Sequence, residues 1–234
     1  MLLVSEVEVF MTFAKMSAAT FTVLVLFIGQ AGGDGDGWAE LRQLDLVLQS
    51  ARVSGSLVYS SCGFQSQVPD RVSIRSLPDY SGPPRDVLER MFRDHPKMRI
   101  TEEPGIIRMA ESDIPTELLD FKIHHLSFGV FPPELSHGPG VAVMAIQANP
   151  EVMAFRKEHN IKPIDDRFVG PGDASSPQPV VTGELNDITV SQALDYILKT
   201  FPGFWIYENC VNEDGQRTVY FSFLKRIPAR ARKQ

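Results

Sequence analysis

The sequence predicts an α+β protein made of two small related β-α-β-β subdomains, and three observations lead to this prediction. A pattern of strand, turn, amphipathic helix and strand hairpin occurs twice. The hydrophobic content of 43% and charged content of 22% are ordinary for a globular protein. The 234 residues suffice for one large domain or two small ones. In each copy, an apolar sheet face and an apolar helix stripe can pack on each other.

The two copies have closely matching spacings, apart from a two-residue difference before the helix. The first copy contains Val72, Asp79, Val87, Leu88, Met91, Pro96, Met98 and Ile100. The second contains Val180, Asp187, Ala193, Leu194, Ile197, Pro202, Phe204 and Ile206. A unit this small has little room for a deep catalytic pocket, so the repeat favours a binding or assembly module over an enzyme.

Residues 1–31 are expected to form a signal peptide. The apolar run at 18–28 is 11 residues long, which is short against the ~20 that a membrane-spanning helix needs. Lys15 precedes the run, and small residues surround Gln30 where a signal peptidase would cleave. We therefore expect cleavage near Ala31, no stable membrane span afterwards, and a periplasmic or secreted location. A buried core helix and an uncleaved anchor are the alternatives.

The first subdomain is expected over residues 32–130. Apolar residues at helical spacing predict a helix from Trp38 to Ala51, and a short strand follows at 57–59. The first repeat copy then predicts a strand from Val72 and a helix that begins near Pro83 with Ser81 as its cap. Two strands follow, at 98–101 and 106–109 around the turn at Pro104-Gly105, with another at 118–128.

Residues 131–178 are expected to link the two subdomains. Stretches rich in proline, glycine and serine, at 131–140 and 170–179, surround a buried strand at 141–148 and a helix that begins at Asn149-Pro150.

The second subdomain is expected over residues 179–224. Thr189 and Gln192 have the spacing of a capping box at the start of its helix. Strands at 204–207 and 218–223 form a hairpin. The tail at 225–234 is basic, so it is either a contact for an anionic partner or a solvated end.

The second copy resembles the secretin and TonB short N-terminal (STN) domain. The resemblance rests on Val181-Thr182-Gly183-Glu184-Leu185-Asn186-Asp187-Ile188-Thr189-Val190-Ser191-Gln192-Ala193-Leu194-Asp195-Tyr196-Ile197-Leu198. Residues 72–109 resemble the family more weakly, because two prolines replace the usual helix entry. The resemblance implies small periplasmic domains that act through protein–protein contact. Pore formation and transport are not implied, because no long barrel region follows.

Other classes of function find little support in the sequence. The formal charge of −6 argues against a nucleic-acid partner. His124 and His125 are adjacent in a predicted strand, so they face opposite sides and cannot readily share a metal. The histidine and cysteine spacings match no metal site, so we expect neither metal nor cofactor.

Cys62 and Cys210 each follow a predicted strand. In an oxidising compartment they can form a disulfide that ties the two halves together, and two buried thiols are the alternative. A reactive Cys62 with His124 or His125 as its base would instead make a small thiol hydrolase.

The aromatic residues of the last two strands are the best candidates for a partner site. Alternation predicts an exposed face or edge carrying Trp205, Tyr207 and Tyr220, which could accept a partner strand. Alternatively, these residues cover a neighbouring subdomain. The sequence thus favours an exported, non-enzymatic protein that binds an envelope protein. A sensor that binds a small molecule between the two halves and the thiol hydrolase are the other readings.

Overall fold

The computed structural model describes residues 37–61, 74–129, 138–162, 179–212 and 214–225. The chain divides into two compact units, residues 1–38 and residues 39–234. All elements below belong to the second unit, apart from the first two residues of helix α2. The expected signal peptide, Cys62, the predicted strand start at Val72 and the tail from Arg226 onward lie outside the described residues.

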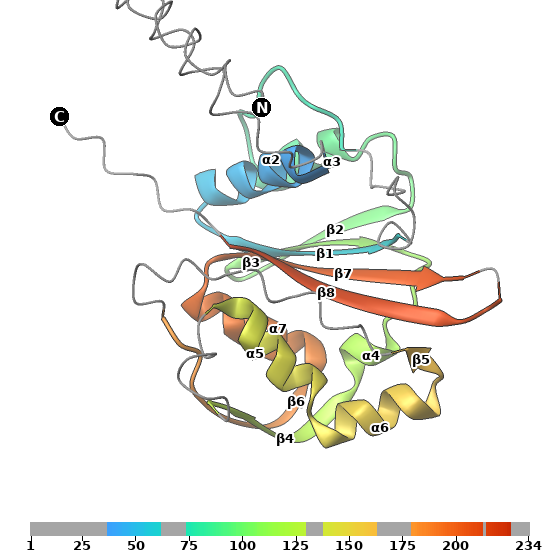
Figure 1. Ribbon diagram of the computed structural model, residues 1–234. Helices are drawn as coiled ribbons and strands as arrows, with labels where there is room; N and C mark the ends of the chain where they lie inside the picture. The colour runs from blue at the N-terminus through green and yellow to red at the C-terminus, as the bar shows by residue number, and fades with distance from the viewer. Residues whose placement is uncertain (1–36, 62–73, 130–137, 163–178, 213, 226–234) are drawn as a thin grey trace, which may run out of the picture. The chain divides into compact units, whose positions relative to one another are not determined.

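A six-stranded mixed sheet forms the centre of the second unit (Figure 1). Its strands, in spatial order, are β2 (Met98–Glu103), β3 (Ile106–Glu111), β1 (Ser54–Ser60), β7 (Gly203–Val211), β8 (Arg217–Lys225) and β5 (Ile161–Lys162). Strand β1 runs parallel to both β3 and β7. The β2–β3 and β7–β8 pairs are antiparallel, and β5 is parallel to β8.

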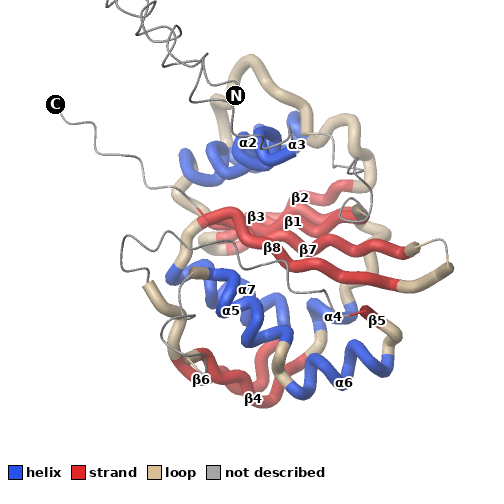
Figure 2. The backbone as a smooth tube through the Cα atoms, in the orientation of Figure 1, coloured by secondary structure: helices blue, strands red, loops and turns tan. Residues whose placement is uncertain are grey.

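Two helices, α2 (Gly37–Ser50) and α3 (Pro84–Met91), cover one face of this sheet (Figure 2). The helix residues buried in this core include Leu44, Leu48, Val87, Leu88 and Met91. The sheet residues in the same core include Leu57, Ile107, Met109, Phe204 and Ile206.

The opposite face is covered by α4 (Glu117–Asp120), α5 (Pro139–Gln147), α6 (Pro150–Glu158) and α7 (Val190–Thr200). A second sheet, of antiparallel β4 (Lys122–Phe128) and β6 (Gly183–Thr189), completes this layer. The shared core contains Trp205, Tyr207 and Phe221 from the large sheet, Leu194 and Ile197 from α7, and Ile123 and Leu126 from β4. Neighbouring residues of β1 point to different cores, Leu57 to the first and Val58 to this one.

The α+β class is confirmed, whereas the division into two subdomains is not. Strands from both repeat copies lie in one sheet, with β1 between β3 of the first copy and β7 of the second. The two hydrophobic cores lie on opposite faces of that sheet.

Several local predictions are confirmed. The helix expected from Trp38, the turn at Pro104-Gly105 and the final hairpin are all present. The Asn149 side chain caps α6 by accepting bonds from the backbone N–H groups of Glu151 and Val152. Thr189 and Gln192 form the capping box of α7. No described helix is long and apolar enough to cross a membrane.

The strand expected at 141–148 is wrong, because this segment belongs to α5. Its buried residues Ala142, Val143 and Ile146 recur at helical spacing. A short, continuously apolar run does not distinguish strand from helix, and Pro139 favours a first helical turn. The strand expected at 118–128 is also shorter, because helix α4 occupies its beginning.

The beginnings of the two copies differ from the prediction as well. Residues 74–77 form no strand; Ile74 is buried, and the N–H of Arg75 donates to the carbonyl of Met91. Ser81 does not cap α3, whose N-cap is Pro83. In the second copy, the strand begins at Gly183 rather than at Val180.

Candidate functional site

The predicted aromatic partner face does not form. Trp205 is 2% exposed and Tyr207 is fully buried, while Tyr220 is half-buried. Strand β7 lies inside the sheet with helices on both faces, so its side chains are buried in both directions from Gly203 to Cys210. Trp205 and Tyr207 instead cover a neighbouring layer, as the alternative interpretation proposed.

Trp205 belongs to a polar network that joins four elements. Its Nε1–H donates to Asp195 Oδ1 on α7 at 2.8 Å. Asp195 Oδ2 accepts from Arg108 Nη2 on β3 at 2.7 Å, and Arg108 Nε donates to Glu103 Oε1 on β2 at 2.8 Å. The hydrogen bond with Glu103 is the main cause that raises the pKa of Arg108. The network thus fixes α7 against the sheet.

Tyr207 belongs to a second network, at the other end of the same face. Its hydroxyl donates to the carbonyl of Pro115 and accepts from Arg217 Nη2 at 3.0 Å. Arg217 also donates to Asn209 Oδ1 at 2.7 Å and pairs with Glu117 at 3.2 Å. Burial raises the pKa of Tyr207. Both predicted aromatic sites are therefore used inside the fold.

Glu208 is a buried carboxyl group that the sequence analysis did not single out. It is 6% exposed and lies opposite Tyr59 in the β1–β7 register. Burial raises its pKa to about 7, and the hydrogen bond from Tyr59 opposes this rise. A lone acidic residue within the apolar run of β7 was the signal in the sequence.

Of the two cysteines expected to form a disulfide, the structure describes only Cys210. Cys210 is fully buried and disulfide-bonded. Cys62 is the chain's only other cysteine, and it lies outside the described residues. The Cys62–Cys210 pairing and the thiol hydrolase therefore stay predictions. The part of the chain that the structure describes contains no free thiol.

His124 and His125 lie on β4 and are both exposed. His124 Nδ1 is 2.7 Å from Glu151 Oε2, and His125 Nδ1 is 3.0 Å from Asn186 Oδ1. They thus have different partners. Among the described residues, no three metal-ligating side chains converge.

The first turn of α6 closes the outer edge of β4. The carboxylate of Glu151 accepts from the backbone N–H groups of His124 and His125, at 3.1 to 3.3 Å. Asn149 Nδ2 donates to the carbonyl of His125 at 2.8 Å. The hydrogen bond with the His124 side chain is the main cause that lowers the pKa of Glu151.

Among the described residues, no side chain of this kind binds the backbone of β6 from Gly183 to Asp187; only the N–H of Thr189, at its end, donates to Gln192 Oε1. Sheet β4–β6 has two strands, so β6 pairs with β4 on one side only (Figure 2). Gly183, Glu184, Asn186 and Asp187 are all exposed. An edge strand of this kind presents backbone N–H and C=O groups that can pair with another strand.

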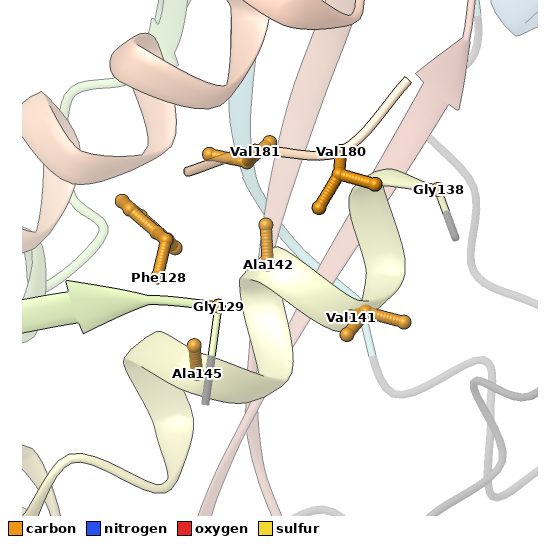
Figure 3. Close-up of a pocket in the computed structure, with 8 residues that line it drawn as sticks. All are labelled: Phe128, Gly129, Gly138, Val141, Ala142, Ala145, Val180 and Val181. Atoms are coloured by element: carbon orange, nitrogen blue, oxygen red, sulfur yellow. The ribbon is translucent and has the colours of Figure 1, made fainter. Parts of the chain in front are cut away.

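A shallow apolar hollow lies where β4 ends beside α5 (Figure 3). Within it, the side chain of Ala142 on α5 points toward Val181. It is lined by Phe128, Gly129, Gly138, Val141, Ala142, Ala145, Val180 and Val181. Its interior has room for about one water molecule.

The chain matches no protein-family model, no curated protein and no solved structure.

Proposed function

We propose that this chain is an exported, non-enzymatic envelope protein that works through protein–protein contact. Its interface is the outer edge of β6, which accepts an extended segment of the partner. This replaces the aromatic face expected from the sequence, because Trp205 and Tyr207 are buried. The resemblance to the STN domain supports this kind of function, since residues 181–198 form β6 and most of α7.

The observation that carries the proposal is the open edge of β6. In strand addition, main-chain hydrogen bonds supply affinity and the flanking side chains supply specificity. Asp187 has a φ of 53°, and the ladder has no pair between it and His124. The regular stretch offered to a partner is therefore Gly183–Asn186.

The contrast with β4 indicates which side the partner uses. Glu151 and Asn149 already occupy backbone groups along the outer edge of β4. A second strand would have to displace α6 to pair there. No described side chain occupies the backbone of Gly183–Asn186 in this way, so extending the sheet at β6 costs less.

The disulfide at Cys210 supports export. Disulfides form and persist in the periplasm and outside the cell, and they are rare in the cytosol. This agrees with the signal peptide expected at residues 1–31.

Site-specific photo-crosslinking in the native envelope tests the proposal. A photoreactive residue at Asn186 should give a discrete crosslinked product with one partner protein. The same residue at Leu46, which is 62% exposed on α2, is the matched control and should give none. Equal products from both positions, or none from Asn186 in a folded protein, would contradict the proposed interface.

A charge substitution provides a second arm. Lysine on an edge strand opposes strand addition, so Glu184→Lys should reduce the Asn186 crosslink. Glu102→Lys, also at an exposed position on an edge strand, makes the same change in the large sheet and should leave the crosslink unchanged. A crosslink that both variants reduce equally would indicate a general charge effect.

A further inference from the structure

A buried guanidinium without a counter-charge lies beside the last strand of the large sheet. Arg156, on α6, is only 7% exposed. Its Nη2 donates to the carbonyl of Lys162 at 2.6 Å, which ties α6 to β5. Its Nε is fully buried and has no hydrogen-bond partner.

No acidic side chain of the described residues compensates the charge of Arg156. Burial alone holds its pKa below the ordinary value, and no carboxylate takes part. This contrasts with Arg108 and Arg217, which both pair with acidic side chains. An arginine remains protonated in proteins, so Arg156 cannot relieve its burial by losing a proton.

The donors of Arg156 are of the type that binds oxyanions. A guanidinium presents parallel N–H groups that match the two oxygens of a carboxylate or phosphate. The bond to Lys162 uses only one of these donors. Lys157 and Lys162, its neighbours on α6 and β5, are exposed and add positive charge. Strand β5 has only two residues, so the sheet ends at this point.

We propose that the free donors of Arg156 bind an oxyanion, a carboxylate or a phosphate group, between α6 and β5. The site is independent of the β6 edge, and it explains why a cation is buried here without an acidic partner. The planar fork of arginine, rather than positive charge alone, sets the preference for a two-oxygen ligand.

Titration of the full chain with inorganic phosphate, and separately with acetate, tests this proposal. The Nε–Hε resonance of Arg156 should shift saturably with at least one of the two probes. At a roughly fifty-fold excess of that probe over its Kd, the Tm should rise by about 5 °C at constant ionic strength. The probe that acts at the lower concentration identifies the oxyanion class. If the resonance does not move with either probe, the buried donors are bound to water and the proposal is overturned.

Three variants separate a bound anion from a structural role. Arg156→Lys keeps the charge and loses the fork, so it should abolish the rise in Tm, whereas the exposed control Lys157→Gln should retain it. The double variant Asp165→Asn/Asp166→Asn removes the acidic residues that follow β5 in the sequence. A wild-type response in this variant supports an external anion. If, without any added probe, the Tm of the double variant falls below that of wild type by as much as the Tm of Arg156→Lys does, the chain supplies its own counter-charge. That result would overturn the proposal.

Discussion

Replacement of Glu208 by glutamine should remove a large part of the pH dependence of stability. The folded protein raises the pKa of this carboxyl group from 4.5 to about 7, because the group is buried. A rise of about 2.5 corresponds to about 3 kcal/mol of differential stability. Glu208 is 6% exposed, so solvent screening reduces this value little.

The sign follows from the state that burial favours. The folded protein holds the proton more tightly than the unfolded chain does, so the contribution to stability is fully present below pH 4.5. It is lost as the pH rises through about 7. Wild-type protein should therefore lose about 3 kcal/mol between these limits through this group, and Glu208→Gln should not.

Denaturant unfolding at a series of pH values measures the effect. The free energy of unfolding is compared between wild type and Glu208→Gln at each pH, so contributions from other groups cancel. Glu102→Gln, at an exposed position, is the control and should follow wild type. Parallel curves for wild type and Glu208→Gln would refute the reasoning, because they would mean that Glu208 ionises as readily in the folded state as in the unfolded one.

Three further substitutions test particular contacts. Trp205→Phe leaves Asp195 without its indole donor and should lower the free energy of unfolding by about 1–2 kcal/mol in denaturant titration; no change would mean that the bond adds nothing. Gly55→Ala places a methyl group 2.7 Å from a leucine side-chain carbon and 3.1 Å from a backbone carbonyl, so it should cost about 1–3 kcal/mol by the same assay, and a neutral result would show that the core can adjust. Cys210→Ser should cost about 3 kcal/mol, and thiol labelling of denatured, unreduced wild type should detect no free thiol; a labelled Cys62 would exclude the predicted pairing.

The sequence predicted helix starts well where a side chain caps the helix from within the same turn. The capping box at Thr189 and the Asn149 cap both formed, because a side chain satisfies free helix N–H groups from within the same turn. Residues 141–148 were misassigned, because an apolar run reveals burial but not its period.

The candidate site depended on long-range arrangement, which periodicity does not encode. Trp205 and Tyr207 do share one face of β7, as the alternation predicted. The prediction that this face is exposed was wrong, because it assumed a sheet covered on one side only. Both faces of β7 are covered by other elements, so neither face is exposed. The open edge of β6 likewise depends on which segments pack together, and the sequence did not indicate it. For Glu208 the sequence did hold a signal, an acidic residue within the apolar run of β7, but its burial depends on the layers that cover both faces of that strand.

The position of β1 determines when this protein can fold. Strand β1 pairs with β7 across about 150 intervening residues, so the middle of the sheet stays incomplete until the last part of the chain is available. Loop closure over such a separation slows folding and exposes apolar strands in the meantime. A chain that is still being synthesised cannot close this sheet, so the centre of the sheet stays incomplete until β7 and β8 are available.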